Sequence, residues 1–380
     1  MLKLILRALS MHNFRNYVKL ELKFNSNLIL FIGKNAQGKT NILESIFLSC
    51  TGRSHRTSKD RELIRWGQDF AAVKILVEKK IGPSMIEILI KNREKKKILI
   101  NGIPAQRIGE LMGHLNCVMF SPEDLKLVKE GPVERRRFMD MELSQIKPQY
   151  FYHLQKYIGI LNQRNSLLKE INQKPYLRKT LPVWNEQLAE IGSYIIYQRH
   201  LFVEKLKNIA REIHQEISHH SEDFNIEYKS SIDYKSVQPE IIQNNFLKSL
   251  EENEEEDISR CITSRGCHRD DLIFTINDID IRTYGSQGQQ RTAVLSLKLA
   301  ELELMFQETG EYPVLLLDDV MSELDSTRKK MLFQYLNKVQ TFITATELES
   351  LPLSDMKDLK VIKIHQGEAV GPVENSGLLV

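Results

Sequence analysis

Hydrophobic and polar positions alternate along residues 1–32, and the alternation ends in the continuous apolar run Leu28–Ile32. A period of two residues predicts β-strands, because successive side chains of a strand point to opposite faces of a sheet. Residues 71–100 follow the same pattern, and the Asn101-Gly102 pair after them is a hairpin turn signal. The first part of the chain is therefore predicted to be rich in β-sheet.

From about residue 122 the hydrophobic positions recur at helical spacing. One such pattern covers 150–161, a segment with two prolines interrupts it, and a second pattern runs from Trp184 to Ile217. At 1.5 Å per residue the second helix would be about 50 Å long. Two helices joined by a proline-containing turn predict either an antiparallel arm or an ordinary bundle packed on the core, and the pattern favours neither. The acidic run at 251–257 is predicted to be a solvated linker.

Strand patterns return at 272–276 and 279–282, and an amphipathic helical pattern follows as far as Leu304. The run Val314–Asp319 is apolar until it ends in two acids, which is typical of a strand buried on both faces of a parallel sheet. We therefore predict an α/β fold, in which a head made of a mixed sheet with helices is interrupted by an inserted helical arm. The predicted domains are the head at 1–120 and 260–370, the arm at 121–259, and a disordered tail at 371–380.

The composition agrees with a soluble globular protein of two domains, because the chain has 380 residues, of which 42% are hydrophobic and 27% charged. The formal net charge of +3 is too small to indicate nucleic-acid binding, so any basic surface has to be local. No apolar run is long enough to span a membrane, and the first residues lack the features of a signal peptide. The four cysteines form no C-x-x-C pair, which favours a reducing cytoplasm and gives no indication of structural zinc.

The segment Gly33–Thr40 has the form Gly-x-x-x-x-Gly-Lys-Thr between a predicted strand and a predicted helix. In this context the backbone N–H groups of the loop converge on phosphate oxygens, and the helix N-terminus adds a favourable partial charge. Lys39 would bind the β- and γ-phosphates, and the hydroxyl of Thr40 would ligate Mg²⁺. The segment therefore predicts a site for a nucleoside triphosphate with Mg²⁺.

The two acids at the end of the later apolar strand complete this site. Asp318 is at the position of a carboxylate that holds Mg²⁺ together with Thr40. Asp319 follows at once and leaves the strand in another direction, so it is the candidate to polarise the attacking water. The alternative is an acidic pair that only caps the next turn, and the intact phosphate loop upstream favours the catalytic interpretation.

The segment Ser286–Gln290 opens a helix, and alone it is as easily a plain N-cap. Followed by the strand and acids at 314–325, it resembles the signature motif of ABC-type ATPases, which act across a dimer interface. From near residue 1 to about residue 367 the chain resembles the RecF family, the bacterial recombination-repair members of the SMC-like branch of that superfamily. The segments that carry the resemblance are FRNY (14–17), GKNAQGKTN (33–41), GRSHRT (52–57), FSPEDLKLVK (120–129), RRRFMD (135–140), GCHRDDL (266–272), GSQGQQRT (285–292) and LLLDDVMSELD (315–325).

The resemblance implies that ATP and Mg²⁺ are the ligands of the phosphate loop. It also implies that Asn13 and Arg15 contact the nucleotide near its base or its phosphates. The nucleotide-binding residues of the loop would be Gly33, Lys34, Asn35, Ala36, Gln37, Gly38, Lys39, Thr40 and Asn41.

The same resemblance implies an ATP-dependent homodimer. Ser286, Gln287 and Gly288 would reach the γ-phosphate bound by the opposite subunit, and Asp325 would link the two sites across the interface. Where transporters carry a switch histidine this chain has Thr344-Ala-Thr346, which predicts slow hydrolysis, so that the weak ATPase acts as a switch.

The resemblance further implies binding of duplex DNA at single-strand gaps, partnership with RecR and RecO, and help in loading RecA on gapped DNA. A duplex requires cations that face its phosphates, and the candidates are Arg53, Arg56, Arg61, Lys126, Lys129, Arg135, Arg136 and Arg137. Taken singly, each is better explained as a solvated charge, and the three consecutive arginines alternatively pack on Asp140 or on the ATP lobe. In the segment 266–270 the family usually has Gly-Pro-His-Arg-Asp, whereas here Cys267 replaces the proline.

The alternative functions are the ATP-binding subunit of an ABC transporter and a short SMC-like structural clamp.

Overall fold

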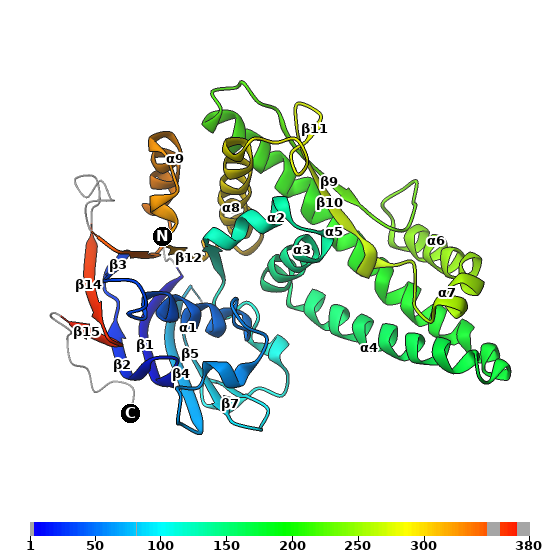
Figure 1. The fold of residues 1–380 in the computed structure, drawn as a ribbon, viewed down its shortest axis with the longest axis horizontal. Helices are drawn as coiled ribbons and strands as arrows, with labels where there is room; N and C mark the ends of the chain where they lie inside the picture. The colour runs from blue at the N-terminus through cyan, green and yellow to red at the C-terminus, as the bar shows by residue number, and fades with distance from the viewer. Residues whose placement is uncertain (1–3, 81, 348–357, 371–380) are drawn as a thin grey trace. The chain divides into compact units, whose positions relative to one another are not determined.

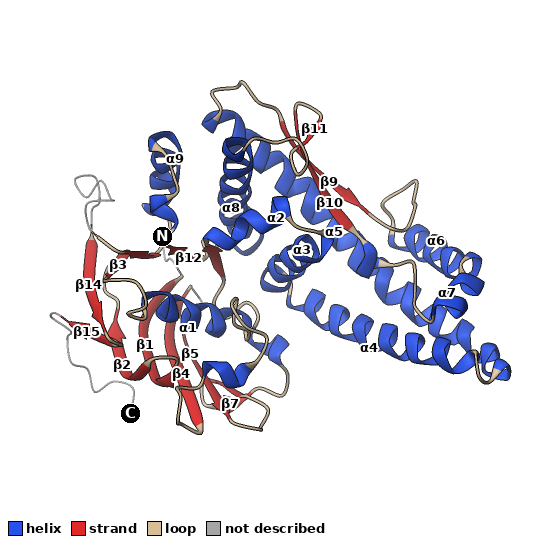
Figure 2. Cartoon of the chain, viewed as in Figure 1, coloured by secondary structure: helices blue, strands red, loops and turns tan. Residues whose placement is uncertain are grey.

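The structure is a computed structural model, and it describes residues 4–80, 82–347 and 358–370. The chain forms two compact units, of which the first takes the sequence up to Asp124 and from Leu295 on, and the second comprises Leu125–Val294. The first unit carries the large β-sheets, and the second is mainly helical (Figure 1, Figure 2). This confirms the predicted fold class, a mixed α/β head whose sequence is interrupted by a long helical insertion. The predicted tail at 371–380 lies outside the described residues.

The first unit contains a six-stranded antiparallel sheet whose strands alternate between buried and more exposed positions. In spatial order its strands are β2 (Tyr17–Lys23), β1 (Ile5–Phe14), β4 (Phe70–Lys79), β5 (Gly82–Lys91), β6 (Lys97–Ile100) and β7 (Ile103–Pro104). The predicted hairpin joins β6 to β7 through Asn101 and Gly102, whose φ angles of 52° and 81° are those that a two-residue turn of this kind requires.

A second six-stranded sheet of the first unit carries the segments that matter for the nucleotide. In spatial order its strands are β15 (Glu368–Val370), β14 (Leu359–His365), β3 (Leu28–Ile32), β13 (Thr341–Ala345), β12 (Val314–Asp318) and β8 (Cys117–Phe120). Apart from β15, neighbouring strands are parallel. Every residue of β3, β12 and β13 is buried, as the apolar runs predicted. Because the strands are parallel, the residues after β3, β12 and β13 lie at the same edge of the sheet.

The helix that follows the phosphate loop is α1 (Lys39–Thr51), and almost all of its residues are buried. It ends at Gly52, whose φ of 68° allows its N–H to donate to the carbonyl of Leu48 and close the last turn. The other helical segments of this unit are η1 (Asp60–Leu63), η2 (Ile108–Leu111), η6 (Val320–Ser322) and α9 (Ser326–Leu336), while η3 (Pro122–Leu125) and α8 (Gln287–Thr309) cross from one unit to the other.

The second unit is built on the 37-residue helix α5 (Leu181–Ile217), which packs against α4 (Pro148–Ile171) and α6 (Pro239–Glu252) (Figure 1). The proline-containing segment between α4 and α5 forms the turn η4 (Pro175–Thr180), so the two predicted helices and their connection are confirmed. Whether the pair acts as an arm stays a prediction. The remaining helical segments are α2 (Lys126–Lys129), α3 (Pro132–Ile146), α7 (Glu254–Arg260) and η5 (Cys267–Arg269).

The acidic run at 251–257 is not a solvated linker, so that prediction is wrong. It spans the end of α6 and the start of α7, and Asp257 is fully buried. The carboxylate of Asp257 accepts a hydrogen bond from Arg164 Nη1 at 2.8 Å, and Arg164 is itself fully buried on α4. Helical spacing turned one acid of the run toward the core, where it neutralises a buried arginine.

The second boundary between the units also differs from the prediction, because it falls after Val294 and not at 259/260. The predicted strands after residue 270 do form, as β10 (Asp271–Ile276) and β11 (Ile279–Asp280). They join β9 (Phe224–Lys229) in a three-stranded sheet of the second unit, with β10 antiparallel to β9. Phe224 and Ile226 of β9 are buried, so this sheet belongs to the core beneath α5.

Candidate nucleotide site

The phosphate loop runs from Gly33 to Gly38 between β3 and α1, in the strand–loop–helix context that the motif requires. Two of its glycines are fixed by close approach. A Cβ at Gly33 would lie 2.3 Å from the carbonyl oxygen of Ile364, and a Cβ at Gly38, where φ is 114°, would lie 2.9 Å from the Tyr17 hydroxyl. Residues 34–36 form the exposed tip of the loop, which leaves their backbone open to a phosphate chain.

Lys39 is 4% exposed, and its ammonium lies within the loop. The Nζ atom donates to the carbonyl oxygens of Gly33 at 2.7 Å and Lys34 at 3.1 Å. An ammonium group has three donors, so these two contacts orient it and are compatible with a third bond to a phosphate oxygen. The position agrees with the predicted role of Lys39 in binding phosphates.

The loop is held from two sides by residues that the sequence prediction did not include. Asn16 Nδ2 donates to the carbonyl of Gln37 at 3.0 Å, and Asn16 Oδ1 accepts from Asn41 Nδ2 at 2.8 Å. Tyr17 donates its hydroxyl to the carbonyl of Gly38 at 3.1 Å. From the other side, the N–H of Gln366 donates to Gln37 Oε1 at 2.6 Å. Asn16 and Tyr17 belong to the FRNY segment, which was the available signal.

The predicted metal residues meet at the edge of the parallel sheet. Asp318, at the end of β12, accepts on Oδ1 the hydroxyl of Thr40 at 2.9 Å and the hydroxyl of Thr344, at the end of β13, at 2.8 Å. Thr40 and Asp318 are 278 positions apart in the sequence. A hydroxyl beside a carboxylate fits Mg²⁺, which is usually held by one or two carboxylates together with phosphate oxygens and water. Within the described residues no group of three or more His, Cys, Asp or Glu side chains forms an alternative metal site.

Asp319 leaves the strand as predicted, in a direction different from that of Asp318. Its φ of 53° places it in the left-handed region, so the backbone turns sharply directly after Asp318. The N–H of Asp319 donates to Thr344 Oγ1 at 2.9 Å, and the same oxygen donates its proton to Asp318. Thr344 therefore fixes both acids at once. From the sequence we interpreted Thr344 only as a replacement for a switch histidine. Its contacts with the two acids were not predicted, because they depend on the order of strands in the sheet.

Asn13 and Arg15 were predicted to contact the nucleotide. Asn13 lies near the end of β1, and Arg15 lies in the turn between β1 and β2. Arg15 donates from Nε and Nη2 to both carboxylate oxygens of Glu44 on α1, at 2.8 and 2.6 Å, and from Nη1 to the carbonyl of Glu62. All three guanidinium nitrogens thus have partners within the protein, and Arg15 ties the turn to the helix of the phosphate loop. Asn13 is buried and its Nδ2 donates to Gln68 Oε1 at 3.4 Å.

The charge on Glu44 is held inside the first unit, since its side chain is fully buried. Burial alone raises the pKa of the Glu44 carboxyl, but hydrogen bonds from Arg15 and Ser54 and the charges of Arg15 and Arg56 outweigh it and lower that pKa below its usual value. Arg56 also donates to Asn41 Oδ1 at 2.9 Å. The segment after α1 is in this way connected to the phosphate loop.

The residues of the signature segment belong to the second unit. Ser286 and Gln287 are exposed directly before and at the start of α8, and Gly288 follows in the first turn. The predicted N-cap is present, because Ser286 Oγ accepts the N–H of Gln289 at 3.1 Å. Asp325 caps α9, with Oδ1 accepting the N–H of Arg328 at 2.9 Å, so the structure gives it a local role.

These features can be compared with known proteins. The model of the RecF/RecN/SMC N-terminal domain family matches residues 5–369. A protein of Alkaliphilus oremlandii named DNA replication and repair protein RecF is 47% identical over 366 residues, which cover 96% of this chain and all of that protein. A protein of the same name from Halothermothrix orenii is 50% identical over 359 residues, covering 93% of this chain and 96% of that protein.

The chain belongs to the RecF family. Among solved structures, the recombination mediator protein RecF-ATP in the RecFOR pathway is similar with a TM-score of 0.91 and 40% identity, covering 97% of each chain. The Smc head domain of Pyrococcus furiosus, at 16% identity and a TM-score of 0.55, covers 96% of this chain and 95% of that one and shares the fold alone. Membership of the RecF family decides against the ABC-transporter alternative. Within the described residues no helix is long and apolar enough to cross a membrane.

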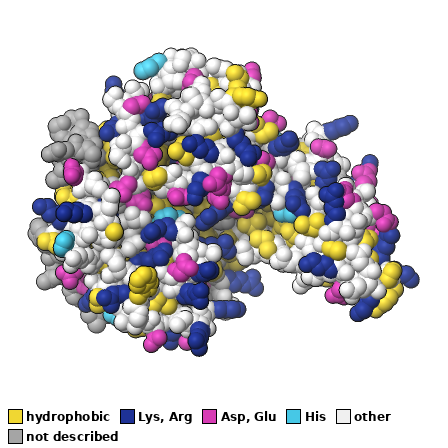
Figure 3. All heavy atoms as spheres, viewed as in Figure 1, with side chains coloured by type: hydrophobic (Ala, Val, Ile, Leu, Met, Phe, Trp, Pro, Cys, Tyr) yellow, Lys and Arg dark blue, Asp and Glu magenta, His cyan; other side chains and the backbone are white. Residues whose placement is uncertain are grey.

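The candidate DNA-binding cations of this RecF family member differ in their surroundings. Arg135 is buried and donates from Nε and Nη2 to both carboxylate oxygens of Asp271, at 2.6 and 2.9 Å. It is therefore not a surface cation, and its partner is not the predicted Asp140. Arg136 donates to the carbonyl of Asp270 at 2.7 Å. The side chains that the structure leaves exposed are those of Arg53, Arg56, Arg61, Lys126, Lys129 and Arg137. Lysine and arginine side chains are interspersed with acids over the face drawn in Figure 3.

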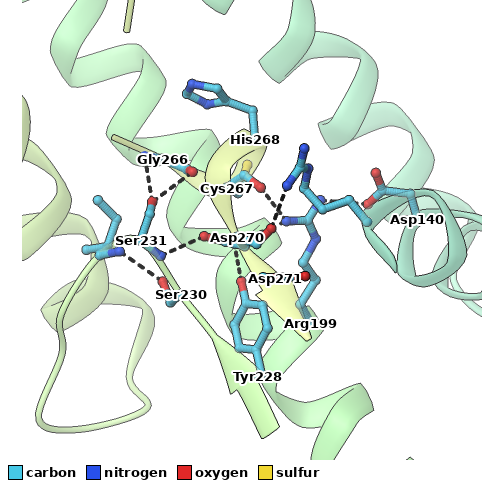
Figure 4. A network of polar contacts seen from close by, with 12 residues as sticks. Asp140, Arg199, Tyr228, Ser230, Ser231, Gly266, Cys267, His268, Asp270 and Asp271 are labelled. Carbon is cyan, nitrogen blue, oxygen red and sulfur yellow. Dashed lines mark hydrogen bonds and ion pairs between the residues drawn. The ribbon is translucent and has the colours of Figure 1, made fainter. Parts of the chain in front are cut away.

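The segment GCHRDDL of the RecF resemblance forms a polar network inside the second unit (Figure 4). Asp270 is fully buried and accepts hydrogen bonds from Arg199 Nη1 at 3.1 Å, from the N–H of Ser231 at 2.8 Å and from the Tyr228 hydroxyl. Arg199 also donates to the carbonyl of Cys267 at 2.5 Å. The segment thus joins α5 to β9 and β10.

The departure at Cys267 has a simple explanation in this network. Cys267 is the first residue of η5, a position at which proline is tolerated because the N–H has no partner within the helix. Its carbonyl oxygen accepts a hydrogen bond from Arg199, and proline and cysteine both carry that group. The exchange therefore leaves the Arg199 contact intact, while the interaction of the Cys267 thiol with Tyr157 is one that proline could not make.

Proposed function

We propose that the protein is an ATP-dependent DNA-binding protein of recombinational repair and replication restart. The observation that carries the proposal is the contact of Thr40 with Asp318 at 2.9 Å, which assembles a phosphate loop and a metal-binding carboxylate from the two ends of the sequence. Membership of the RecF family supports the repair role, since its relatives are named DNA replication and repair proteins. A structure of one RecF protein is described with ATP, which supports ATP as the nucleotide.

In the proposed cycle ATP binding joins two copies of the chain. Lys39 and the loop N–H groups of one copy hold the phosphates, and Ser286 and Gln287 of the other copy bind the γ-phosphate. Both of these residues are exposed, which suits a contact with a second molecule. Since the same surface serves both copies, the dimer has two-fold symmetry and encloses two nucleotides.

Hydrolysis opens this dimer, because loss of the γ-phosphate removes the ligand of Ser286. Asp319 polarises the attacking water in this proposal, and Thr344 holds Asp319 at its backbone. When Mg²⁺ is bound, Thr40 and Asp318 would hold it, and it neutralises charge on the phosphates. Replacement of Asp319 by asparagine is therefore expected to prolong the ATP-bound dimer.

The dimer is proposed to clamp duplex DNA at single-strand gaps and to aid loading of RecA together with RecO and RecR. The solved relative is assigned to the RecFOR pathway, which supports these partners. Exposed cations such as Arg53, Arg61 and Arg137 are the proposed phosphate contacts. The remaining alternative is a short SMC-like clamp. It has the same head fold, but it would not have to prefer DNA with single-strand gaps over continuous duplex.

Sedimentation of the full chain with ATP, ADP and duplex DNA tests the proposal. ATP should produce a dimer that binds duplex, and ADP should leave the chain monomeric. Lys39→Ala is expected to lose ATP binding, dimerisation and tight DNA binding together, whereas Ser286→Arg should bind ATP as a monomer and fail to dimerise. A chain that stays monomeric when saturated with ATP at high protein concentration would overturn the proposal.

A further inference from the structure

The N-terminus of α8 is closed by two reciprocal hydrogen bonds. Gln289 donates its backbone N–H to Ser286 Oγ at 3.1 Å, and Ser286 donates its backbone N–H to Gln289 Oε1 at 3.0 Å. This is a capping box, in which each residue satisfies the other. Because Ser286 Oγ accepts from the backbone, its own proton is left to point away from the helix. The side chain of Gln289 therefore holds the backbone of Ser286, and the backbone N–H of Gln289 holds the Ser286 hydroxyl.

The other end of the Gln289 side chain is also held. Its Nε2 donates to Glu222 Oε1 at 2.9 Å, and the second oxygen of Glu222 lies 2.9 Å from Nε2 of His214. Since a carboxylate only accepts, this ring nitrogen carries the proton. His214 belongs to α5, where it is fully buried and stacked on Phe224 with ring centroids 5.0 Å apart. Three side chains, those of His214, Glu222 and Gln289, thus connect the interior of the second unit to the signature serine.

Glu222 determines the orientation of the Gln289 side-chain amide. An amide side chain has an acceptor end and a donor end, and a flip would exchange them. In the flipped form Gln289 would set its NH₂ group against the N–H of Ser286 and its oxygen against the carboxylate of Glu222. Both contacts would be repulsive, so Glu222 selects the orientation that completes the capping box. A neutral glutamine at 222 would weaken this selection, because it has one acceptor in place of two and would satisfy both neighbours only if His214 changed its tautomer.

We propose that Glu222 is a positioning residue, supported by His214, that sets Gln289 and through it presents Ser286 to the γ-phosphate held by a second copy of the chain. This inference rests on the proposed function, since it concerns the same contact between subunits. It assigns a role in nucleotide-dependent dimerisation to a residue far in sequence from every nucleotide motif. Glu222 makes no contact with the nucleotide in this account and acts only through Gln289.

Glu222→Gln tests the inference, with Asp223→Asn as the matched control. Asp223 is the next residue and forms an exposed ion pair with Arg211, so the control removes the same charge without touching Gln289. Four quantities are measured: the affinity of the monomer for a fluorescent ATP analogue at low protein concentration, the dimer dissociation constant in ATP, and kcat and KM of the ATPase. For Glu222→Gln we expect unchanged monomer affinity, a dimer weakened about tenfold, as for loss of one hydrogen bond to a charged group, and a reduced kcat. Asp223→Asn should match the wild type.

A merely structural role would reduce thermal stability without separating monomer affinity from dimer affinity, and that outcome would overturn the inference. It would also be overturned if Glu222→Gln dimerised and hydrolysed ATP like the wild type while Ser286→Arg remained monomeric, and the proposed function would then stand. If wild-type chain failed to dimerise in ATP, the proposed function and the inference would both be lost. Should Glu222→Gln not fold, Gln289→Ala carries the same expectation, because alanine preserves the helix and removes the link.

Discussion

Thr344→Val tests whether the threonine at the end of β13 prepares the metal side of the nucleotide site. The hydroxyl of Thr344 is fully buried, donates to Asp318 Oδ1 at 2.8 Å and accepts the N–H of Asp319 at 2.9 Å. Valine has nearly the same shape and neither donor nor acceptor. The substitution therefore removes one hydrogen bond to a charged group and one to a backbone amide, with little change in packing.

The size of the effect follows from these two bonds. A neutral hydrogen bond contributes about 1 kcal/mol to stability and one to a charged group about 1.5–3 kcal/mol, so the free energy of unfolding should fall by roughly 3 kcal/mol. The effect on the metal is more specific. Loss of a residue that orients a metal-binding carboxylate typically costs about 10–100-fold in metal affinity. We therefore expect the Mg²⁺ concentration at half-maximal ATPase activity to rise at least about tenfold.

The assay is the ATPase rate at saturating ATP as a function of free Mg²⁺, with stability measured by urea unfolding. Thr341→Val is the matched control, because Thr341 is equally buried on the same strand and its hydroxyl lies 3.5 Å from the carbonyl of Val339. Thr344→Ser keeps the hydroxyl and should retain the wild-type Mg²⁺ midpoint. Equal Mg²⁺ midpoints for Thr344→Val and Thr341→Val would refute the role given to Thr344.

Three further predictions concern the other networks. Burial lowers the pKa of His268 to about 4, from an ordinary value of 6.5. Between these two pH values the unfolded chain binds a proton that the folded chain does not, so the stability of the second unit should fall by up to about 3 kcal/mol as the pH drops. His268→Gln should flatten this pH dependence, which is measured by the fluorescence of Trp184 in a Trp66→Phe background. Arg15→Met leaves Glu44 buried without its main partner and should destabilise the chain by about 3 kcal/mol, and adding Glu44→Gln should restore part of the loss measured by urea unfolding. Arg137→Glu should weaken duplex binding and lower its salt dependence, whereas Lys248→Glu on the exposed face of α6 should not, as fluorescence anisotropy at several salt concentrations will show.

The sequence allows a residue's role in the proposed nucleotide site to be predicted where that role follows from its immediate neighbours. Gly33 lies in a loop, and Lys39 and Thr40 begin the helix after it, and both the preceding strand and this helix are visible as local patterns. Asp318 ends a strand whose apolar run marks it as central. The roles of Thr344, Asn16 and Glu44 were not predicted, because each depends on which strands become neighbours. Thr344 meets Asp318 only because β13 pairs with β12 in parallel register. Nothing local to residue 344 carries that information.

In the second unit, too, the surroundings of charged residues could not be predicted from the sequence alone. Consecutive arginines on a helix point about 100° apart, so the triplet at 135–137 was bound to contain residues in different environments. The chain placed Arg135 toward Asp271 in the core and left Arg137 exposed. The strand β9 was missed although Phe224, Ile226 and Tyr228 alternate with polar residues. Recognising that strand would have given β10 a partner and moved the predicted boundary between the units.

The topology shows how the inserted second unit is connected to the strand that ends at Asp318. The last strand before the second unit, β8, and the strand that ends at Asp318, β12, are direct neighbours, so the insertion joins two adjacent strands of the parallel sheet. The return path is α8, a single 23-residue helix that starts beside Ser286 and contains the boundary between the units at Val294 and Leu295. Its later residues, among them Leu297 and Leu302, are fully buried. Along the chain, one helix therefore leads from the proposed dimer contact at Ser286 toward the strand that ends at Asp318, the proposed metal-binding carboxylate.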